Sequence, residues 1–104
     1  MPQSHSRELA VIKELVTKDN YHYSRKVRDF IEDGWFQEED LEQCICTATG
    51  IYKVEDDEFK TAIDGKKYTV LGRDTQGQPF YTCGKMILAE KGRLYFFITA
   101  HKAK

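Results

Sequence analysis

The chain has 104 residues, of which 40% are hydrophobic and 32% are charged. These values indicate one folded domain with a single core, and they exclude a disordered chain and a pair of separate domains. Basic and acidic residues nearly balance, 16 against 17, which gives a formal net charge of −1. Because proteins that bind nucleic acid usually carry a basic excess, such a role here would need a local basic patch.

The sequence contains no apolar stretch long enough to span a membrane, and its first residues lack the apolar core of a signal peptide. We therefore expect a cytoplasmic protein without membrane contact. The three cysteines are an odd number, and Cys44 and Cys46 are too close in sequence to form a disulfide easily. Together with Cys83 they are expected to be reduced thiols.

Three amphipathic helices are predicted in the first half of the chain. Apolar residues recur every three or four positions over residues 6–18 and again over 21–33, where Gly34 provides a C-terminal cap. The acidic segment 37–40 begins a third helix that ends near residue 50, because acidic groups complement the helix dipole. Trp35 and Phe36, at the joint between the second and third helices, are predicted to fill the core.

After Gly50 the apolar period changes from 3.6 to 2, which predicts strands over residues 59–63, 66–73, 80–89 and 94–101. Residues 51–54 form either a short strand or an extended lead-in. Asp64-Gly65 is a two-residue hairpin signal. The predicted fold is α+β, with three N-terminal helices packed on one face of a four-stranded antiparallel meander. One domain would cover 1–104, with a helical extension at 1–19, helices at 20–50 and the sheet at 51–104.

The last two predicted strands are apolar on both faces, whereas an antiparallel sheet normally keeps one face polar. These strands are therefore expected to be central, or to line a groove or a subunit contact. Four polar groups interrupt them or their neighbour: Arg73, Lys85, Thr99 and His101. Arg73 and Lys85 each follow a glycine, which permits close approach of a ligand but equally marks a β-bulge.

A sheet face that offers arginine, lysine and histidine could clamp a phosphate and transfer protons to and from it. For Lys60 and Lys67 we favour the alternative that they are solvated residues protecting the sheet from aggregation. His22 is predicted in the first turn of the second helix, where the dipole would lower its pKa and suit a general base. The alternative is a capping histidine without chemistry.

A zinc site that joins the cysteines to His22 or His101 is the less favoured interpretation. The Cys-x-Cys spacing with one distant cysteine is not a regular ligand pattern, and a helix would point Cys44 and Cys46 to different sides. Buried cysteine is the commoner case. We therefore expect no metal and no cofactor.

Several short motifs resemble the bacterial domain-of-unknown-function family 4258, over about residues 21–100. They are Tyr21-His22-Tyr-Ser-Arg25, Val27-Arg28, Gly34, Glu38-Glu-Asp40-Leu41, Tyr68-Thr-Val-Leu-Gly72-Arg73, Gly77 and Phe97-Ile-Thr-Ala100. That family is similar in fold to the RelE/ParE and barnase-like toxin ribonucleases. The resemblance implies a site at His22, Arg25 or Arg28, Arg73 and Thr99. The near-neutral charge and His101 depart from the family's pattern.

Two functional hypotheses follow. In the first, the protein is a small metal-independent endoribonuclease of toxin type, with RNA as substrate and an antitoxin as partner. Either His22 or His101 would act as the base and the other as the acid, and Arg73 and Lys85 would stabilise charge on the phosphate. In the second, the protein is a non-catalytic module whose sheet face binds a protein partner or forms a homodimer.

Overall fold

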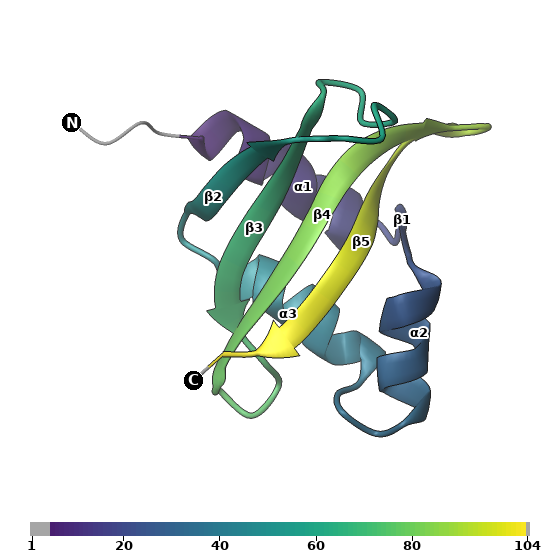
Figure 1. Ribbon diagram of the computed structural model, residues 1–104. Helices are drawn as coiled ribbons and strands as arrows, with labels where there is room; N and C mark the ends of the chain where they lie inside the picture. The colour runs from purple at the N-terminus through teal and green to yellow at the C-terminus, as the bar shows by residue number, and fades with distance from the viewer. Residues whose placement is uncertain (1–4, 104) are drawn as a thin grey trace.

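Figure 1 presents the computed structural model, which describes residues 5–103; the predicted domain limits, 1 and 104, lie outside this range. The described part contains three helices and five strands. In chain order they are α1 (Ser6–Thr17), β1 (Tyr21–Tyr23), α2 (Arg25–Glu32), α3 (Glu38–Thr47), β2 (Ile51–Asp56), β3 (Lys66–Arg73), β4 (Pro79–Ala89) and β5 (Gly92–Lys102). The chain is α+β, as the sequence predicted.

The sheet is mixed and five-stranded, in the order β1-β5-β4-β3-β2, so the predicted four-stranded antiparallel meander is wrong. Strands β2 to β5 are antiparallel neighbours, but β1 pairs in parallel with β5. As a result β5 lies between β1 and β4. The central position expected for the last two strands is confirmed.

Strand β1 occupies positions that the sequence assigned to the start of the second helix. Its three residues pair with Tyr95, Phe96 and Phe97 of β5. Helix α2 begins only afterwards, because Ser24 is its N-cap and accepts a hydrogen bond from the Val27 backbone N–H at 3.2 Å. The Ser24 hydroxyl also donates to the Ile98 carbonyl at 2.8 Å, which fixes this junction to the sheet.

The predicted strand 59–63 and its two-residue hairpin are also wrong. Residues 51–56 form the strand β2 that pairs with β3, and residues 57–65 form a loop between them. One Asp57 carboxylate oxygen accepts the backbone N–H groups of Thr61 and Ala62, both at 2.8 Å, and the other accepts that of Phe59 at 3.2 Å. These bonds hold the segment in a turn and leave Lys60 with a φ of 57°.

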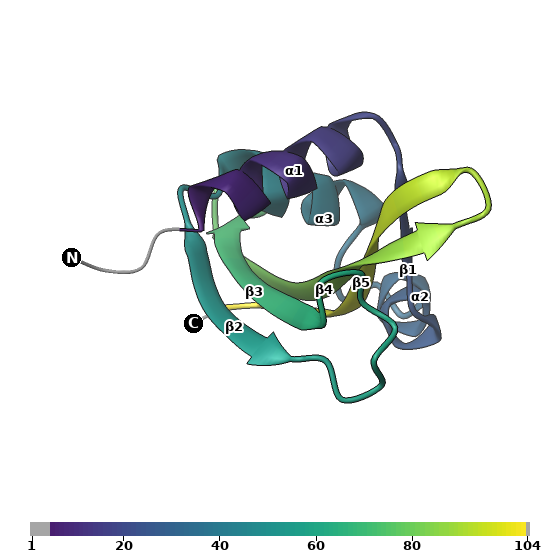
Figure 2. The ribbon, with the colours of Figure 1, turned by 90° about the horizontal axis from the view of Figure 1, so that it is seen from above.

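The two faces of the sheet are covered differently. Helices α1 and α3 lie together on one face, here called the inner face (Figures 1 and 2). Helix α2 packs beside β5 at the edge of the sheet instead of joining them, so the prediction of three helices on one face is wrong. The opposite face, here called the outer face, is the one seen in Figure 1 and is not covered by any described helix.

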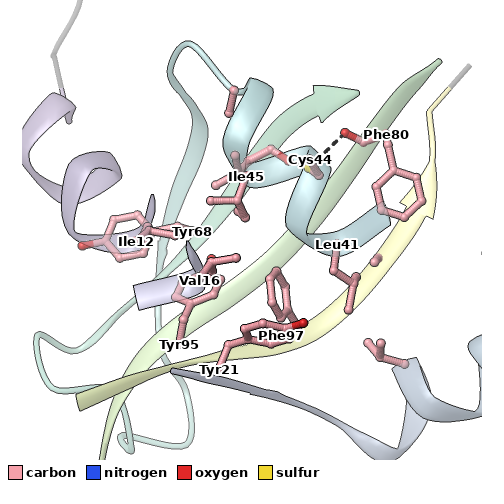
Figure 3. Packing of buried hydrophobic residues seen from close by; sticks show 14 of the residues in the cluster. Ile12, Val16, Tyr21, Leu41, Cys44, Ile45, Tyr68, Phe80, Tyr95 and Phe97 are labelled. Atoms are coloured by element: carbon pink, nitrogen blue, oxygen red, sulfur yellow. Dashed lines mark hydrogen bonds between the residues drawn. The ribbon is translucent and has the colours of Figure 1, made fainter. Parts of the chain in front are cut away.

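The core lies between the inner face and the two helices (Figure 3). Its largest fully buried side chains come from every layer, among them Ile12, Leu41, Phe80, Tyr95 and Phe97. The prediction for the joint between α2 and α3 is only half right. Phe36 is buried in the core against Phe80, whereas Trp35 is 66% exposed.

The glycines next to Arg73 and Lys85 make room for atoms of the core and not for a ligand. A Cβ on Gly72 would lie 2.0 Å from the Cys44 carbonyl oxygen, and one on Gly84 would lie 2.5 Å from the Tyr95 ring. The β4–β5 register also shifts between Cys83 and Gly84, so the bulge is present. Both glycines face inward, which leaves the cations beside them on the outer face.

Candidate functional site on the outer face

The register places the predicted polar groups of the strands on the outer face, but it distributes them along its whole length. Lys85 is opposite Phe96 near the middle of the sheet, and His101 is opposite Tyr81 near its end. Arg73 is opposite Pro79, two strands away from His101, or about 10 Å laterally. The groups therefore share a face without meeting at one point.

Lys85 is a structural residue in this fold. Its ammonium lies 3.2 Å from one Asp57 carboxylate oxygen and 3.3 Å from the other, and both residues are buried. The Phe59 ring covers the ammonium, 5.6 Å from its centroid. With its charge compensated, Lys85 holds the 57–65 loop against β4 and is not directed toward a substrate.

The Asp57 carboxylate is strongly stabilised in its ionised form. Burial works to raise its pKa, but hydrogen bonds from the Ala62, Thr61 and Phe59 backbone and from Lys85 outweigh that effect and lower the pKa to about 2. Asp57 is therefore a permanent anion at neutral pH. Its role is to shape the loop.

His22 is outside the first helical turn where the sequence placed it. It lies in β1, is exposed, and neighbours Phe96 on β5. From Phe96 to His101 is five residues, or roughly 16 Å at about 3.3 Å per residue. The two imidazoles do not meet at one phosphate. Arg25 and Arg28 are exposed on α2.

Arg73 is exposed, and its guanidinium donates to the Gly77 carbonyl at 2.9 Å. Its backbone N–H donates to the Thr47 hydroxyl at 2.8 Å, which ties the end of β3 to α3. One guanidinium contact therefore closes the β3–β4 turn. The remaining guanidinium donors are on the outside of the domain, at the end of the sheet.

Thr99 and His101 are the two predicted residues that the structure brings together. The Thr99 hydroxyl and His101 Nε2 are 3.4 Å apart. The imidazole lies between two aromatic rings, 5.0 Å from the Phe30 centroid on α2 and 5.7 Å from the Tyr81 centroid on β4. His101 is thus one ring in a row of rings.

That row crosses the outer face near the ends of β3 and β5. We call it the aromatic strip and define it by Tyr52, Tyr81, His101 and Phe30, with Leu71 between the two tyrosines. Tyr52 is 73% exposed and Leu71 43%. A hollow of about 280 Å³ opens on the strip, lined by Tyr52, Thr69, Leu71, Tyr81 and Ala103. The hollow is shallow and almost entirely apolar.

Sequence reasoning missed the strip's tyrosines. Tyr81 alternates with core residues along β4. This period of two does not show which face of the sheet the helices cover. Tyr52 is the extra residue where the β2–β3 register shifts between Ile51 and Lys53, and that irregularity is invisible in the sequence. The available signal was the rule that one face of an antiparallel sheet can remain open.

Cations flank the strip without forming a basic patch. Arg73 and Lys102 are exposed at its end of the sheet. Lys53 and Lys67 lie along β2 and β3, where carboxylates of Glu55 and Glu58 approach them at 3.5 and 3.6 Å. The electrostatic attraction offered to an anion is therefore moderate and comes mainly from Arg73 and Lys102.

Cys83 lies on the outer face opposite Thr99, whereas Cys44 is buried in the core and Cys46 is exposed on α3. All three are free thiols. Burial raises the pKa of the Cys44 thiol to about 11, although hydrogen bonds work in the other direction, so it remains protonated at neutral pH. Within residues 5–103, no cluster of three or more histidine, cysteine, aspartate or glutamate side chains could hold a metal ion. No helix in that range is long and apolar enough to span a membrane.

Comparisons of the chain with protein-family models, with curated proteins and with solved structures give no match. The resemblance to family 4258 and to toxin ribonucleases stays a prediction from the sequence motifs. Functional inference therefore rests on the outer face.

Proposed function

We propose that the protein binds single-stranded RNA on the outer face of its sheet. The observation that carries the proposal is the aromatic strip, in which Tyr52 is exposed and the other rings are half-buried, on a sheet whose other face is closed by α1 and α3. Sheets of this kind bind single-stranded RNA by stacking unpaired bases on exposed aromatic side chains. The core supplies a rigid support for such stacking.

The geometry of the strip suits the unpaired bases of a single strand and not the paired bases of a duplex. Tyr52, Tyr81 and His101 come from β2, β4 and β5, so a single strand would cross the sheet and meet one ring after another. The hollow between the tyrosines has an apolar floor at Leu71 and is open to one planar group. Arg73 lies beside this path on the outer face, where it can contact a phosphate, and Lys102 follows His101 at the end of β5, opposite Phe80.

The net charge of −1 sets the expected strength of binding. Few phosphates would be neutralised, so most of the affinity must come from stacking, and the salt dependence should be shallow. Replacing one stacking ring with alanine should cost about 1–3 kcal/mol of binding free energy. A near-neutral protein with a stacking surface is expected to bind RNA weakly and with little sequence preference.

Cleavage of the bound RNA is the second candidate, and His101 is the observation that favours it. Its imidazole lies in the strip next to the Thr99 hydroxyl, within reach of a ribose whose base stacks on Tyr81. His22 is too far along β1 to serve as the second proton-transfer group, and Lys85 is neutralised by Asp57. We therefore rank binding above the ribonuclease reaction.

Fluorescence anisotropy with a labelled twelve-nucleotide oligo-uridylate tests the proposal. We expect binding that Tyr81→Ala weakens by about fivefold or more, since loss of one stacked base costs at least about 1 kcal/mol. Leu88→Ala is the matched control, because Leu88 is 75% exposed at the far end of β4 and outside the strip. Equal affinity of both variants would contradict the proposal.

The same samples, incubated in EDTA and analysed on a denaturing gel, test cleavage. Chain scission that His101→Ala abolishes would establish the ribonuclease reaction. Absence of RNA binding combined with a dimer in light scattering would instead favour the protein-binding alternative.

A further inference from the structure

A second hollow lies where the aromatic strip meets helix α2. It has a volume of about 310 Å³ and is lined by Phe30, Trp35, Phe36, His101 and Lys102. The Phe30 ring packs against both His101 and Phe36, so the hollow has an aromatic wall continuous with the strip. Trp35, which is 66% exposed, is the outermost of these side chains in exposed fraction.

This hollow is the end of the path across the outer face. Strand β5 is the last long strand on this side, and α2 packs beside it, so the open surface stops there (Figure 2). A single strand that crosses from Tyr52 toward His101 cannot continue past α2 on the same plane. Its last base would therefore enter the hollow and lie against the exposed Trp35 ring.

The charge at the hollow suits a terminal phosphate. Lys102 is exposed at its rim, at the end of β5. The nearby Asp40 carboxylate is already engaged, because it accepts hydrogen bonds from the Gln37 and Thr75 backbones and from the Thr75 hydroxyl at 2.8 to 2.9 Å. The Lys102 charge contributes to lowering the pKa of that carboxylate, and because the Lys102 side chain is exposed, its ammonium can also reach an incoming anion.

We infer that this hollow binds the terminal nucleotide of an RNA strand that carries a phosphomonoester. The base stacks on Trp35, and the phosphate approaches Lys102 and His101. The inference rests on the proposed RNA-binding function. A phosphate at the 5′ end and one at the 3′ end share this chemistry. The direction in which the RNA crosses the sheet decides which end enters the hollow.

Trp35 is the only tryptophan of the chain, so its fluorescence reports on this hollow directly. Titration with uridine monophosphate should quench Trp35 more strongly than uridine or inorganic phosphate at the same concentration. Lys102→Ala should reduce the affinity for uridine monophosphate about two- to fivefold and leave uridine unchanged, as expected for one exposed charge contact. Lys53→Ala, at the opposite end of the strip, is the matched control and should change neither.

Short oligo-uridylates with a 5′-phosphate, a 3′-phosphate or neither then identify the end. One phosphorylated form should bind about two- to fivefold tighter than the unphosphorylated strand, and Lys102→Ala should remove that difference. Equal binding of all three, with uridine monophosphate no better than uridine, would overturn the inference while leaving the strip as an RNA surface. Quenching by the mononucleotide without any binding of the oligonucleotide would instead overturn the proposed function.

Discussion

Adjacent residues on one strand show how differently the two sheet faces are used. On β3, Val70 points inward and is completely buried, whereas Leu71 points outward and is 43% exposed. On β4, Phe80 is completely buried and its neighbour Tyr81 takes part in the aromatic strip. Apolar character alone does not separate the residues that stabilise this fold from those available for binding. The covering helices do.

The inner face accounts for most of the stability because it removes whole aromatic and aliphatic side chains from water. The outer face keeps exposed rings on a scaffold that does not depend on them. If this division is correct, substitutions on the two faces should have opposite effects on stability and on RNA binding. The four predictions below test that division, in order of decreasing effect on the free energy of unfolding.

The first prediction compares Phe80→Ala with Tyr81→Ala. Removing the buried Phe80 ring should lower the free energy of unfolding by about 3–5 kcal/mol, measured by urea denaturation. Tyr81→Ala should lower it by about 1 kcal/mol or less. Affinity for oligo-uridylate should follow the reverse order, provided that it is measured at a temperature where both variants are folded. A similar loss of stability in both variants would contradict the division.

The second prediction concerns the close approach of β3 to helix α3. Gly72→Ala would place a Cβ 2.0 Å from the Cys44 carbonyl oxygen, a backbone atom that cannot rotate away. We expect a loss of about 1–3 kcal/mol in the free energy of unfolding. Gly50→Ala is the control, since nothing lies within 4 Å of its new Cβ and its φ is not positive. Tolerance of Gly72→Ala would show that α3 is not seated on β3 as described.

The third prediction uses the pH dependence of stability. The pKa of Asp57 is about 2 in the folded protein, below the usual value of about 3.9 in an unfolded chain. The carboxylate therefore stabilises the fold above about pH 4, and this contribution is lost as the pH falls from 4 toward 2. The difference in melting temperature between wild type and Asp57→Asn should be largest at pH 7 and should shrink over that interval.

Asp56→Asn is the control for this pH series. The hydrogen bond to Lys66 lowers the pKa of Asp56 as well, but the carboxylate is exposed, so its variant should show a smaller difference at every pH. A constant difference between wild type and Asp57→Asn from pH 7 to pH 2 would show that the loop does not depend on the Asp57 charge.

The fourth prediction concerns the smallest change in the free energy of unfolding. Tyr52→Ala should change the free energy of unfolding by no more than about 0.5 kcal/mol, because the ring is 73% exposed. It should nevertheless weaken binding of oligo-uridylate, since Tyr52 forms one wall of the apolar hollow. Unchanged RNA affinity in a folded Tyr52→Ala protein would confine the binding surface to Tyr81 and His101.

Local patterns in the sequence predicted much of this fold. The first helix and the strands β3, β4 and β5 lie where apolar periodicity placed them, and the third helix begins at its acidic segment, all within a few residues. Strand β1 could not be predicted in this way, because Tyr21–Tyr23 continues a helical spacing and its strand partner lies more than seventy residues away. The 57–65 loop was missed because one Asp57 side chain collects three backbone donors and Lys85, against an alternating pattern.

The candidate site was predicted in part for the same reason. Thr99 and His101 could be found because polar groups are unusual within an apolar strand. Lys85 met the same criterion, but its partner Asp57 lies 28 residues earlier and neutralises it. Tyr52 and Trp35 were missed because an aromatic residue next to a core pattern is normally buried, and only the tertiary structure shows which ring remains outside.

Backbone amide NMR with increasing oligo-uridylate tests the central claim most directly, because it maps the bound surface without any substitution. If the outer face binds RNA, the shifts should be largest at Thr69, Leu71, Tyr81, Thr99 and His101. The amides of α1 and of the buried side of α3 should change little. Shifts concentrated on α1, or at the β4–β5 hairpin far from the strip, would contradict the account.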